Sequence, residues 1–221
     1  MRLFPLKSQS ANSNSMNIIK LFKEISRLRN VLKTDKEALK RLDPSFETWY
    51  QFLFHAGYRA LRLYRLSRAF YLSGFKFLAY LIYHTNRILY SVDIHPAADI
   101  EPGVVIDHGI GVVIGSTAVV GTGTVIYHGV TLGAKYITTG KRHPTVGRNV
   151  IIGAGAKILG PIEIGDYAKI GANAVVIESV PKNVTVAGIP AKIVKINNSS
   201  LEESDSLCKI KPELTLIGVE Y

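Results

Sequence analysis

Residues 145–176 read TVGRNVIIGAGAKILGPIEIGDYAKIGANAVV, and a regular repeat runs through this segment. An aliphatic residue returns at every sixth position: Val146, Ile152, Ile158, Ile164, Ile170 and Val176. A sustained six-residue repeat is typical of a parallel β-helix, in which each repeat forms a short strand and a turn. Three repeats complete one coil of a triangular prism. The aliphatic side chains point into the prism and stack at the spacing of paired strands, about 4.8 Å.

The same period extends toward the N-terminus through Ile94, Ile100, Ile106, Ile114, Val120, Ile126 and Leu132. The residue four positions later is also expected to point inward and to be small or β-branched. These residues are Ala98, Val104, Ile110, Ala118, Thr124, Val130, Val150, Ala156, Ile162, Ala168, Ala174 and Val180. Chance alternation in an ordinary all-β domain is the competing explanation, and so many positions in register argue against it. We therefore predict a parallel β-helix over residues 93–195.

Two insertions interrupt the repeat. One adds two residues next to Asp107-His108, and the other adds eight residues that end beside Arg142-His143. A loop that leaves a regular solenoid is more often functional than architectural, so the chemistry is expected at these two places. The handedness of the coil does not follow from the repeat; the usual rule for parallel crossover connections would make it right-handed.

The chain before the repeat has a helical period. We expect helices over 17–32, 34–42, 46–72 and 75–91. Thr34, with Glu37 three residues later, predicts a capping box at the start of the second helix, and Asp43-Pro44 predicts the break after it. Residues 1–15 are polar and expected to be a disordered tail. This leaves a helical domain over 16–92 and a C-terminal tail over 196–221.

The net charge of +10 is concentrated in the first 92 residues, which hold 16 Lys and Arg against 5 Asp and Glu. A nucleic acid or an anionic membrane surface is one explanation. However, Arg59, Arg62, Arg65 and Arg68 recur every third residue beside apolar neighbours, which predicts a solvated stripe on an amphipathic helix. The sequence also lacks the motifs of nucleic-acid-binding folds, so no nucleic-acid partner is expected.

The cysteine content and the apolar runs indicate the compartment. Cys208 is the only cysteine, so neither an intrachain disulfide nor a cysteine-based zinc site is expected. The apolar runs are shorter than the roughly 20 residues of a membrane span. The N-terminus lacks the apolar segment of a signal peptide. We expect a soluble protein of the cytoplasm.

The repeat and the polar residues around it resemble the serine O-acetyltransferases of the hexapeptide-repeat acyltransferase superfamily. The matching segments are VDIHPAADI (92–100), IDHGIGVVIGSTAVVG (106–121), HGVTLG (128–133), KRHPTVGRNVIIGAGAKILGPIEIG (141–165), AKIGANAVV (168–176) and AGIPAKIV (187–194). The resemblance implies an α+β fold, with an N-terminal helical domain followed by a left-handed parallel β-helix. It also implies a homo-oligomer, either a trimer or a dimer of trimers, with acetyl-CoA bound in the groove between adjacent prisms.

The resemblance further implies acetyl transfer from acetyl-CoA to L-serine, which gives O-acetyl-L-serine for cysteine biosynthesis. His108 corresponds to the family's general base, a task that suits a neutral imidazole near pH 7. Asp93 corresponds to the carboxylate that orients this imidazole. The simpler alternatives are a solvent-facing turn histidine for His108 and a cap of the helix-to-solenoid junction for Asp93.

The acceptor and cofactor residues are implied in the same way. Asp43 and Asp107 correspond to ligands of the serine ammonium, Arg142 to the ligand of its carboxylate, and His143 to a catalytic residue that orients the hydroxyl end. Asp43 before a proline is also a common helix-break pair. The residues implied for acetyl-CoA are Ala134, Ala154, Ala172 and Lys192. Lys192 has an ordinary solvated surface lysine as its alternative.

Three other functions are weighed against this one. Some hexapeptide-repeat proteins are zinc carbonic anhydrases, but the spacing of His108, His128 and His143 differs from theirs, so no metal is expected. A sugar or antibiotic hydroxyl could replace serine as acceptor, although such an enzyme has no need of the Asp43, Asp107 and Arg142 set. A non-catalytic oligomeric scaffold is the third possibility.

The sequence also departs from the family. Residues 134–137 stand where the family has a Gly-rich start to the long loop. Lys141 replaces the acidic residue before the RHP triplet, and Ser116 replaces the Glu that usually precedes the Thr-Ala pair. Relatives that dock into the sulfhydrylase of the pathway end in Ile, whereas this chain ends in Tyr221. We therefore expect no tight complex with a sulfhydrylase through the tail.

Overall fold

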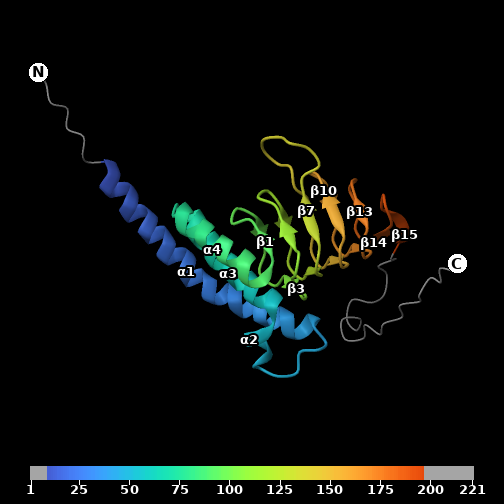
Figure 1. Ribbon diagram of the computed structural model, residues 1–221, viewed down its shortest axis with the longest axis horizontal. Helices are drawn as coiled ribbons and strands as arrows, with labels where there is room; N and C mark the ends of the chain where they lie inside the picture. Colours follow the sequence, from blue (N-terminus) through green and yellow to red (C-terminus); the bar gives the residue numbers. More distant parts are fainter. Residues whose placement is uncertain (1–8, 197–221) are drawn as a thin grey trace, which may run out of the picture.

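Four helices precede the β-helix in the computed structural model, which describes residues 9–196 (Figure 1). They are α1 (Gln9–Leu42), α2 (Gln51–Phe54), α3 (Ala56–Leu72) and α4 (Lys76–Tyr90). α3 packs between α1 and α4, and it also contacts the first coil of the prism. None of the helices in this part of the chain is long and apolar enough to cross a bilayer.

The strands form three sheets, one on each face of the prism. The first face contains β1 (Asp93–Ile94), β4 (Val113–Ile114), β7 (Thr131–Gly133), β10 (Lys157–Leu159) and β13 (Val175–Val176). The second contains β2 (Asp99–Ile100), β5 (Val119–Val120), β8 (Thr145–Val146) and β11 (Glu163–Ile164). The third contains β3 (Val105–Ile106), β6 (Val125–Ile126), β9 (Ile151–Ile152), β12 (Lys169–Ile170), β14 (Val184–Ala187) and β15 (Lys192–Ile196). All neighbouring pairs are parallel except β14 and β15.

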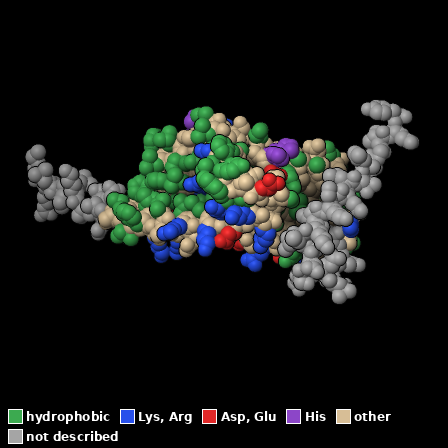
Figure 2. All heavy atoms as spheres, turned by 90° about the horizontal axis from the view of Figure 1, so that it is seen from below, with side chains coloured by type: hydrophobic (Ala, Val, Ile, Leu, Met, Phe, Trp, Pro, Cys, Tyr) green, Lys and Arg blue, Asp and Glu red, His purple; other side chains and the backbone are tan. Residues whose placement is uncertain are grey.

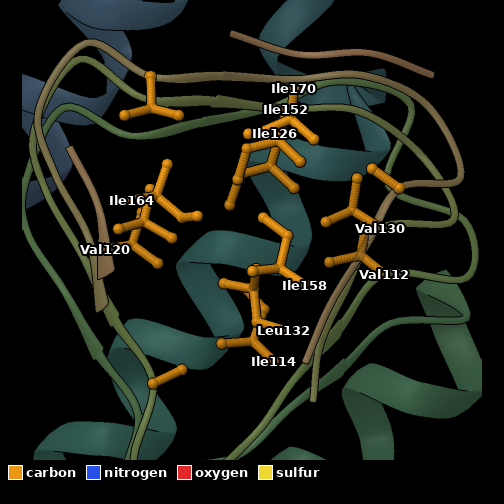
Figure 3. Packing of buried hydrophobic residues seen from close by; sticks show 14 of the residues in the cluster. Val112, Ile114, Val120, Ile126, Val130, Leu132, Ile152, Ile158, Ile164 and Ile170 are labelled. Atoms are coloured by element: carbon orange, nitrogen blue, oxygen red, sulfur yellow. The ribbon is translucent and has the colours of Figure 1, made fainter. Parts of the chain in front are cut away.

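The core is the predicted ladder of aliphatic side chains. Every predicted repeat residue from Ile94 to Val176 is buried, and equivalent residues of successive coils are paired in register. Ile114, Leu132 and Ile158 stack on the first face, as Figure 3 shows. Full burial of one such side chain contributes about 1.5–3 kcal/mol, so the stacked rows hold the prism together.

Ile110 does not point inward as expected. Its side chain is 66% exposed, and Val112 is buried in its place. The cause is the two-residue insertion, which lengthens the turn through left-handed conformations at His108, Gly109 and Gly111. The inward-pointing position consequently lies two residues later in the chain, at Val112 instead of Ile110.

Two expectations for α1 are wrong. The helix begins at Gln9, inside the stretch expected to be a disordered tail, and it runs without a break past Thr34. The Thr34 hydroxyl donates to the Asn30 carbonyl at 3.1 Å, the usual bond of a threonine within a helix rather than at its start. Continuity also places Asp35 against α3 and the first coil, where it is buried.

The single helix expected over 46–72 is interrupted. The Gln51 side chain accepts the backbone N–H groups of Glu47 and Thr48 at 2.7 Å and donates to the Ser45 carbonyl, so residues 45–51 bond locally. His55 then adopts an extended backbone and caps α3. The expected helix over 75–91 agrees with α4.

Arg65 is not part of a solvated stripe. Its guanidinium is 6% exposed and forms a two-point contact with Asp35, at 3.1 Å for both Nε and Nη2. Nη2 also donates to the Glu101 carbonyl at 2.7 Å. Beside it, the Tyr64 hydroxyl donates to the Ala98 carbonyl at 2.7 Å. These bonds fasten α1 and α3 to the first coil.

Candidate functional site

His108 lies in the turn between β3 and β4, where the third face of the prism meets the first. We call this edge, with the turns stacked on it, the His108 corner. The backbone φ of His108 is 60°, a left-handed conformation that is uncommon for a residue other than glycine and that clusters at functional sites. The imidazole is 68% exposed, and its Nε2 lies 3.8 Å from Asp107 Oδ1. It is thus accessible to an acceptor hydroxyl.

Gly57 brings the helical domain against this corner. A Cβ on Gly57 would lie 2.0 Å from the Ile106 carbonyl oxygen, so the first turn of α3 rests directly on the end of β3. His55 and Asp43 are carried to the corner with it. One ligand atom each of Asp43, His55 and Asp107 lies within 4.8 Å of the others. The predicted ammonium ligands Asp43 and Asp107 are therefore brought together beside His108.

Asp43 is held by its neighbours on both carboxylate oxygens. Oδ1 accepts the Ser45 backbone N–H at 2.9 Å and the Ser45 hydroxyl at 2.6 Å. Oδ2 lies 3.5 Å from His55 Nε2. Burial, followed by the negative charges of Asp107 and Asp43, raises the pKa of the nearby Tyr127 phenol. The turn role expected of an Asp-Pro pair is present, and the second oxygen faces the corner.

The same three side chains have the ligand types of a cation site, but the state of the histidine does not fit a metal. His55 Nδ1 accepts the backbone N–H of Tyr58 at 3.1 Å, so the neutral ring carries its proton on Nε2. Nε2 therefore presents an N–H instead of a lone pair to Asp43. The histidines of the zinc alternative are also divided: His128 packs edge-on against His108, whereas His143 belongs to another corner.

His143 ends the long loop between β7 and β8, where the first face meets the second. We call this edge the His143 corner. Nδ1 lies 2.9 Å from the Thr117 hydroxyl and accepts the Thr117 backbone N–H at 3.2 Å. Burial, and then the charges of Arg142, Lys141 and His95, lower the pKa of the imidazole. The neutral ring carries its proton on Nε2, and the ring lies against Gly115.

Arg142 reaches the same corner. Its backbone N–H donates to the Thr117 hydroxyl oxygen at 3.1 Å, and its guanidinium donates to the Thr138 carbonyl at 3.1 Å across the loop. Arg142 and His143 therefore form one group, and Asp43, Asp107 and His108 form another. The two groups lie on different corners of one prism.

Asp93 is not beside His108 as expected. It lies on the first face, where it accepts a hydrogen bond from the Tyr83 hydroxyl of α4 and approaches Arg87 at 3.5 Å. Burial and this bond raise the pKa of Tyr83 to about 12. Burial lowers the pKa of His95, on which the nearby charges of Asp93 and Arg142 act in opposite directions. Within residues 9–196 of a single chain, Asp93 thus belongs with the His143 corner.

The residues expected to bind acetyl-CoA are distributed over both corners. Ala154 and Ala172 lie in successive turns of the His108 corner, with the Ala154 carbonyl accepting from Asn173 at 2.8 Å. Ala134 starts the loop of the His143 corner and is exposed. Lys192 is exposed on β15. The first two continue the edge of the prism that begins at His108.

His55 and Thr117 were not expected in the site. The helix predicted over 46–72 placed His55 in its interior, although a polar residue just before Ala56-Gly57 is compatible with a cap. Thr117 stands one coil before the loop that it supports, and its role depends on how the eight inserted residues return to the prism. The sequence gives no sign of that path.

The sequence of this chain is similar to those of known proteins. Residues 143–178 match the family model described as bacterial transferase hexapeptide (six repeats). The serine acetyltransferase of Mycobacterium tuberculosis is 48% identical over 164 residues, which cover 74% of this chain and 72% of that protein. Among solved structures, the serine acetyltransferase of Brucella abortus in complex with coenzyme A has a TM-score of 0.77 at 39% identity, over 82% of this chain and 73% of that one.

A second solved structure, a serine acetyltransferase in complex with cysteine, has a TM-score of 0.77 at 40% identity and covers 81% of this chain and 75% of that one. The coil is the left-handed β-helix of these structures, which confirms the fold implied by the resemblance and differs from the right-handed rule for parallel crossover connections. That rule follows from packing a crossover helix on a sheet, and the connections here are turns of a few residues. The shared fold and the level of identity place this chain in the serine acetyltransferase family.

Proposed function

We propose that this chain transfers the acetyl group of acetyl-CoA to the hydroxyl of L-serine, with His108 as general base. The product is O-acetyl-L-serine, a precursor for cysteine biosynthesis in the cytoplasm. The observation that carries this proposal is the Asp43 and Asp107 pair beside His108. Two carboxylates suit the ammonium of an amino acid, and the base lies next to them.

The reaction is a direct transfer. The neutral imidazole of His108 takes the hydroxyl proton while the serine oxygen attacks the thioester carbonyl. The tetrahedral intermediate collapses, the carbon–sulfur bond breaks, and the proton passes from the imidazolium to the leaving CoA sulfur. The Asp107 carboxylate lies beside this imidazole, with Oδ1 3.8 Å from His108 Nε2.

Serine also needs a ligand for its carboxylate, and we assign this to Arg142 with His143. These residues lie on the other corner of the prism, too far around it for one small amino acid to contact both groups. A second copy that places its His143 corner against the His108 corner would complete the site and would bring its Asp93 toward His108. Exposed apolar side chains at both corners, Ile110 and Ile137, support such contacts. We therefore propose a homotrimer with one site between each pair of copies.

Acetyl-CoA would lie along the His108 corner. Ala154 and Ala172 lack side chains that would cover the backbone there, which leaves room for the pantetheine arm. Ala134 of the adjacent copy would line the opposite wall, and Lys192 would meet a phosphate. The expectation about sulfhydrylase docking concerns residues 197–221, which lie outside the described part of the chain, and it stays a prediction.

An acceptor panel tests the proposed function. Release of free CoA thiol from acetyl-CoA is measured with L-serine, with 3-hydroxypropanoate (which lacks the ammonium group) and with a set of sugars and aminoglycosides. We expect efficient turnover with serine alone. Turnover with a sugar or antibiotic in preference to serine would overturn the assignment of the acceptor. An absence of thiol release with every acceptor would favour the scaffold.

A further inference from the structure

His55 joins the start of α3 to the acceptor site. It is the N-cap of α3, and its Nδ1 accepts the Tyr58 backbone N–H at 3.1 Å. The neutral imidazole therefore keeps its proton on Nε2, and Nε2 lies 3.5 Å from Asp43 Oδ2. The helix cap thus selects the tautomer that faces Asp43 with an N–H group.

This contact addresses a problem at the His108 corner. The Asp43 and Asp107 carboxylates repel each other at their short separation, and each would otherwise turn toward solvent. A neutral donor holds Asp43 in place without neutralising its charge, whereas a lysine or arginine would take the place of the ligand. The His55 and Asp43 side chains are only 15% and 13% exposed, so water screens their contact little.

The position of His55 is itself fixed. Gly57, two residues later, lets α3 approach the Ile106 carbonyl closely, and Gly109 of the same corner packs against Gly57. The His55 ring is therefore tied to the catalytic turn through backbone contacts, and Ser45 restrains the other oxygen of Asp43.

We propose that His55 is a positioning residue of the acceptor site, which holds the Asp43 carboxylate toward Asp107 so that the pair binds the ammonium group of an amino-acid acceptor. This inference rests on the proposed function. It assigns His55 to the selection of an acceptor that carries an ammonium group, because a hydroxyl compound without one gains nothing from the ordered carboxylates.

Two substitutions separate the cap from the contact with Asp43. Asn is among the best N-cap residues, and its Oδ1 takes the place of Nδ1, but His55→Asn is too short to reach Asp43. Gln is a poor cap, but the amide nitrogen of His55→Gln reaches the place of Nε2. The melting temperature, the KM for serine, the KM for acetyl-CoA and kcat are measured for both variants and for the wild type.

We expect His55→Asn to melt close to the wild type while its KM for serine rises about tenfold, because the 3.5 Å contact that positions Asp43 is lost. Its KM for acetyl-CoA should stay unchanged, and so should its weak turnover of 3-hydroxypropanoate. His55→Gln should melt at a lower temperature and keep a KM for serine near that of the wild type.

An unchanged KM for serine in His55→Asn would overturn the inference. So would a rise in the KM for serine confined to His55→Gln and accompanied by its lower melting temperature, because His55 would then act only as a cap. Failure of the wild type to acetylate serine would instead overturn the proposed function, so the two failures are distinguishable.

Discussion

The left-handed backbone of His108 costs the folded chain about 1–3 kcal/mol relative to a residue that adopts it freely. Asn149, Asn173 and Asn183 occupy the same conformation at other turns, and Asn tolerates it well. The imidazole at His108 is thus kept against the local preference of the backbone, which is expected where a side chain has a chemical task.

His108→Asn should therefore separate stability from activity. We expect a free energy of unfolding equal to or above that of the wild type, and a kcat lower by about 10²–10⁴-fold through loss of the general base. Urea unfolding and the thiol-release assay measure the two effects. His128→Asn, a change in the ring that packs against His108, is the matched control and should alter kcat only slightly. Near-normal turnover of His108→Asn would remove the imidazole from the mechanism.

Gly115 gives a second test at the scale of one residue. A Cβ there would lie 2.1 Å from Nε2 of His143, so Gly115→Ala must displace the imidazole. A misplacement of about 1 Å can cost about 10²-fold, and we expect kcat/KM for serine to fall by that order. In Gly133→Ala the Cβ meets only side-chain atoms of Leu159 and Thr131, at 3.0 Å and 3.2 Å, which can shift. This control should retain activity; equal losses in the two variants would contradict the role of His143.

The lowered pKa of His143 predicts a pH effect on stability. Between the folded pKa and the ordinary value of about 6.5, the unfolded chain binds more protons than the folded one. Stability therefore falls as the pH drops below about 6.5. Urea unfolding at pH 7 and pH 5.5 should show a smaller fall for His143→Asn, which keeps an acceptor for Thr117, than for the wild type. An equal fall in both would show that His143 titrates normally.

Among the secondary-structure elements, α1 depends most on one buried ion pair. Asp35 is 1% exposed and contacts both Arg65 and the Gly103 backbone N–H, at 2.7 Å for the latter. Removing one partner leaves a buried charge alone, so Asp35→Ala should lower the free energy of unfolding by about 3–5 kcal/mol. Glu37→Ala, in the exposed pair with Lys33, should change it by less than about 1 kcal/mol. Similar losses would mean that α1 is held by its apolar contacts alone.

The elements differ in how far the sequence predicts them. Leu132 and Val146 keep their places in the ladder although the loop between them adds eight residues to the six-residue repeat, because burial repeats with each coil. The predicted inward position of Ile110 is wrong because the sequence does not show where in the turn the two extra residues are accommodated. The left-handed residues of the structure show that place. The break before α3 depends on Gln51, whose side-chain hydrogen bonds to nearby backbone groups take the place of the backbone bonds of a helix. Local composition does not reveal such competition.

The candidate site was predicted as a set of residues and not as an arrangement. Motif resemblance identifies Asp107, His108, Arg142 and His143, but it does not say that they lie on two corners. The path of the loop from β7 to β8 decides this. His55 was not predicted as a site residue, because its role depends on the start of α3, which the apolar period does not mark.

In the proposed trimer, the separation of the two corners predicts that inactive subunits can complement one another. His108→Asn impairs one corner and His143→Asn the other, so each variant alone should be nearly inactive. When the two chains mix at random in a trimer, about a quarter of the interfaces contain both a native His108 and a native His143. We expect co-refolded mixtures to regain about that fraction of wild-type activity. Mixtures as inactive as the separate variants would place the complete site within one chain.

The helical layer leaves a large apolar surface at one end of the molecule. Phe22 of α1 and Phe77 and Ile88 of α4 are mostly exposed, and Figure 2 shows apolar side chains gathered beside lysines and arginines on the face it displays. Apolar side chains gathered in this way on an isolated chain are typical of an interaction surface.

The loop between β7 and β8 leaves the ladder undisturbed, because Leu132 still pairs with Ile158 and Val146 with Ile164 on either side of it. Doubling the length of a flexible loop costs only about 0.6 kcal/mol. The solenoid can therefore accept altered loops at this corner with little risk to folding. Replacing this loop is therefore expected to change which acceptor binds while the proposed base and the rest of the prism stay in place.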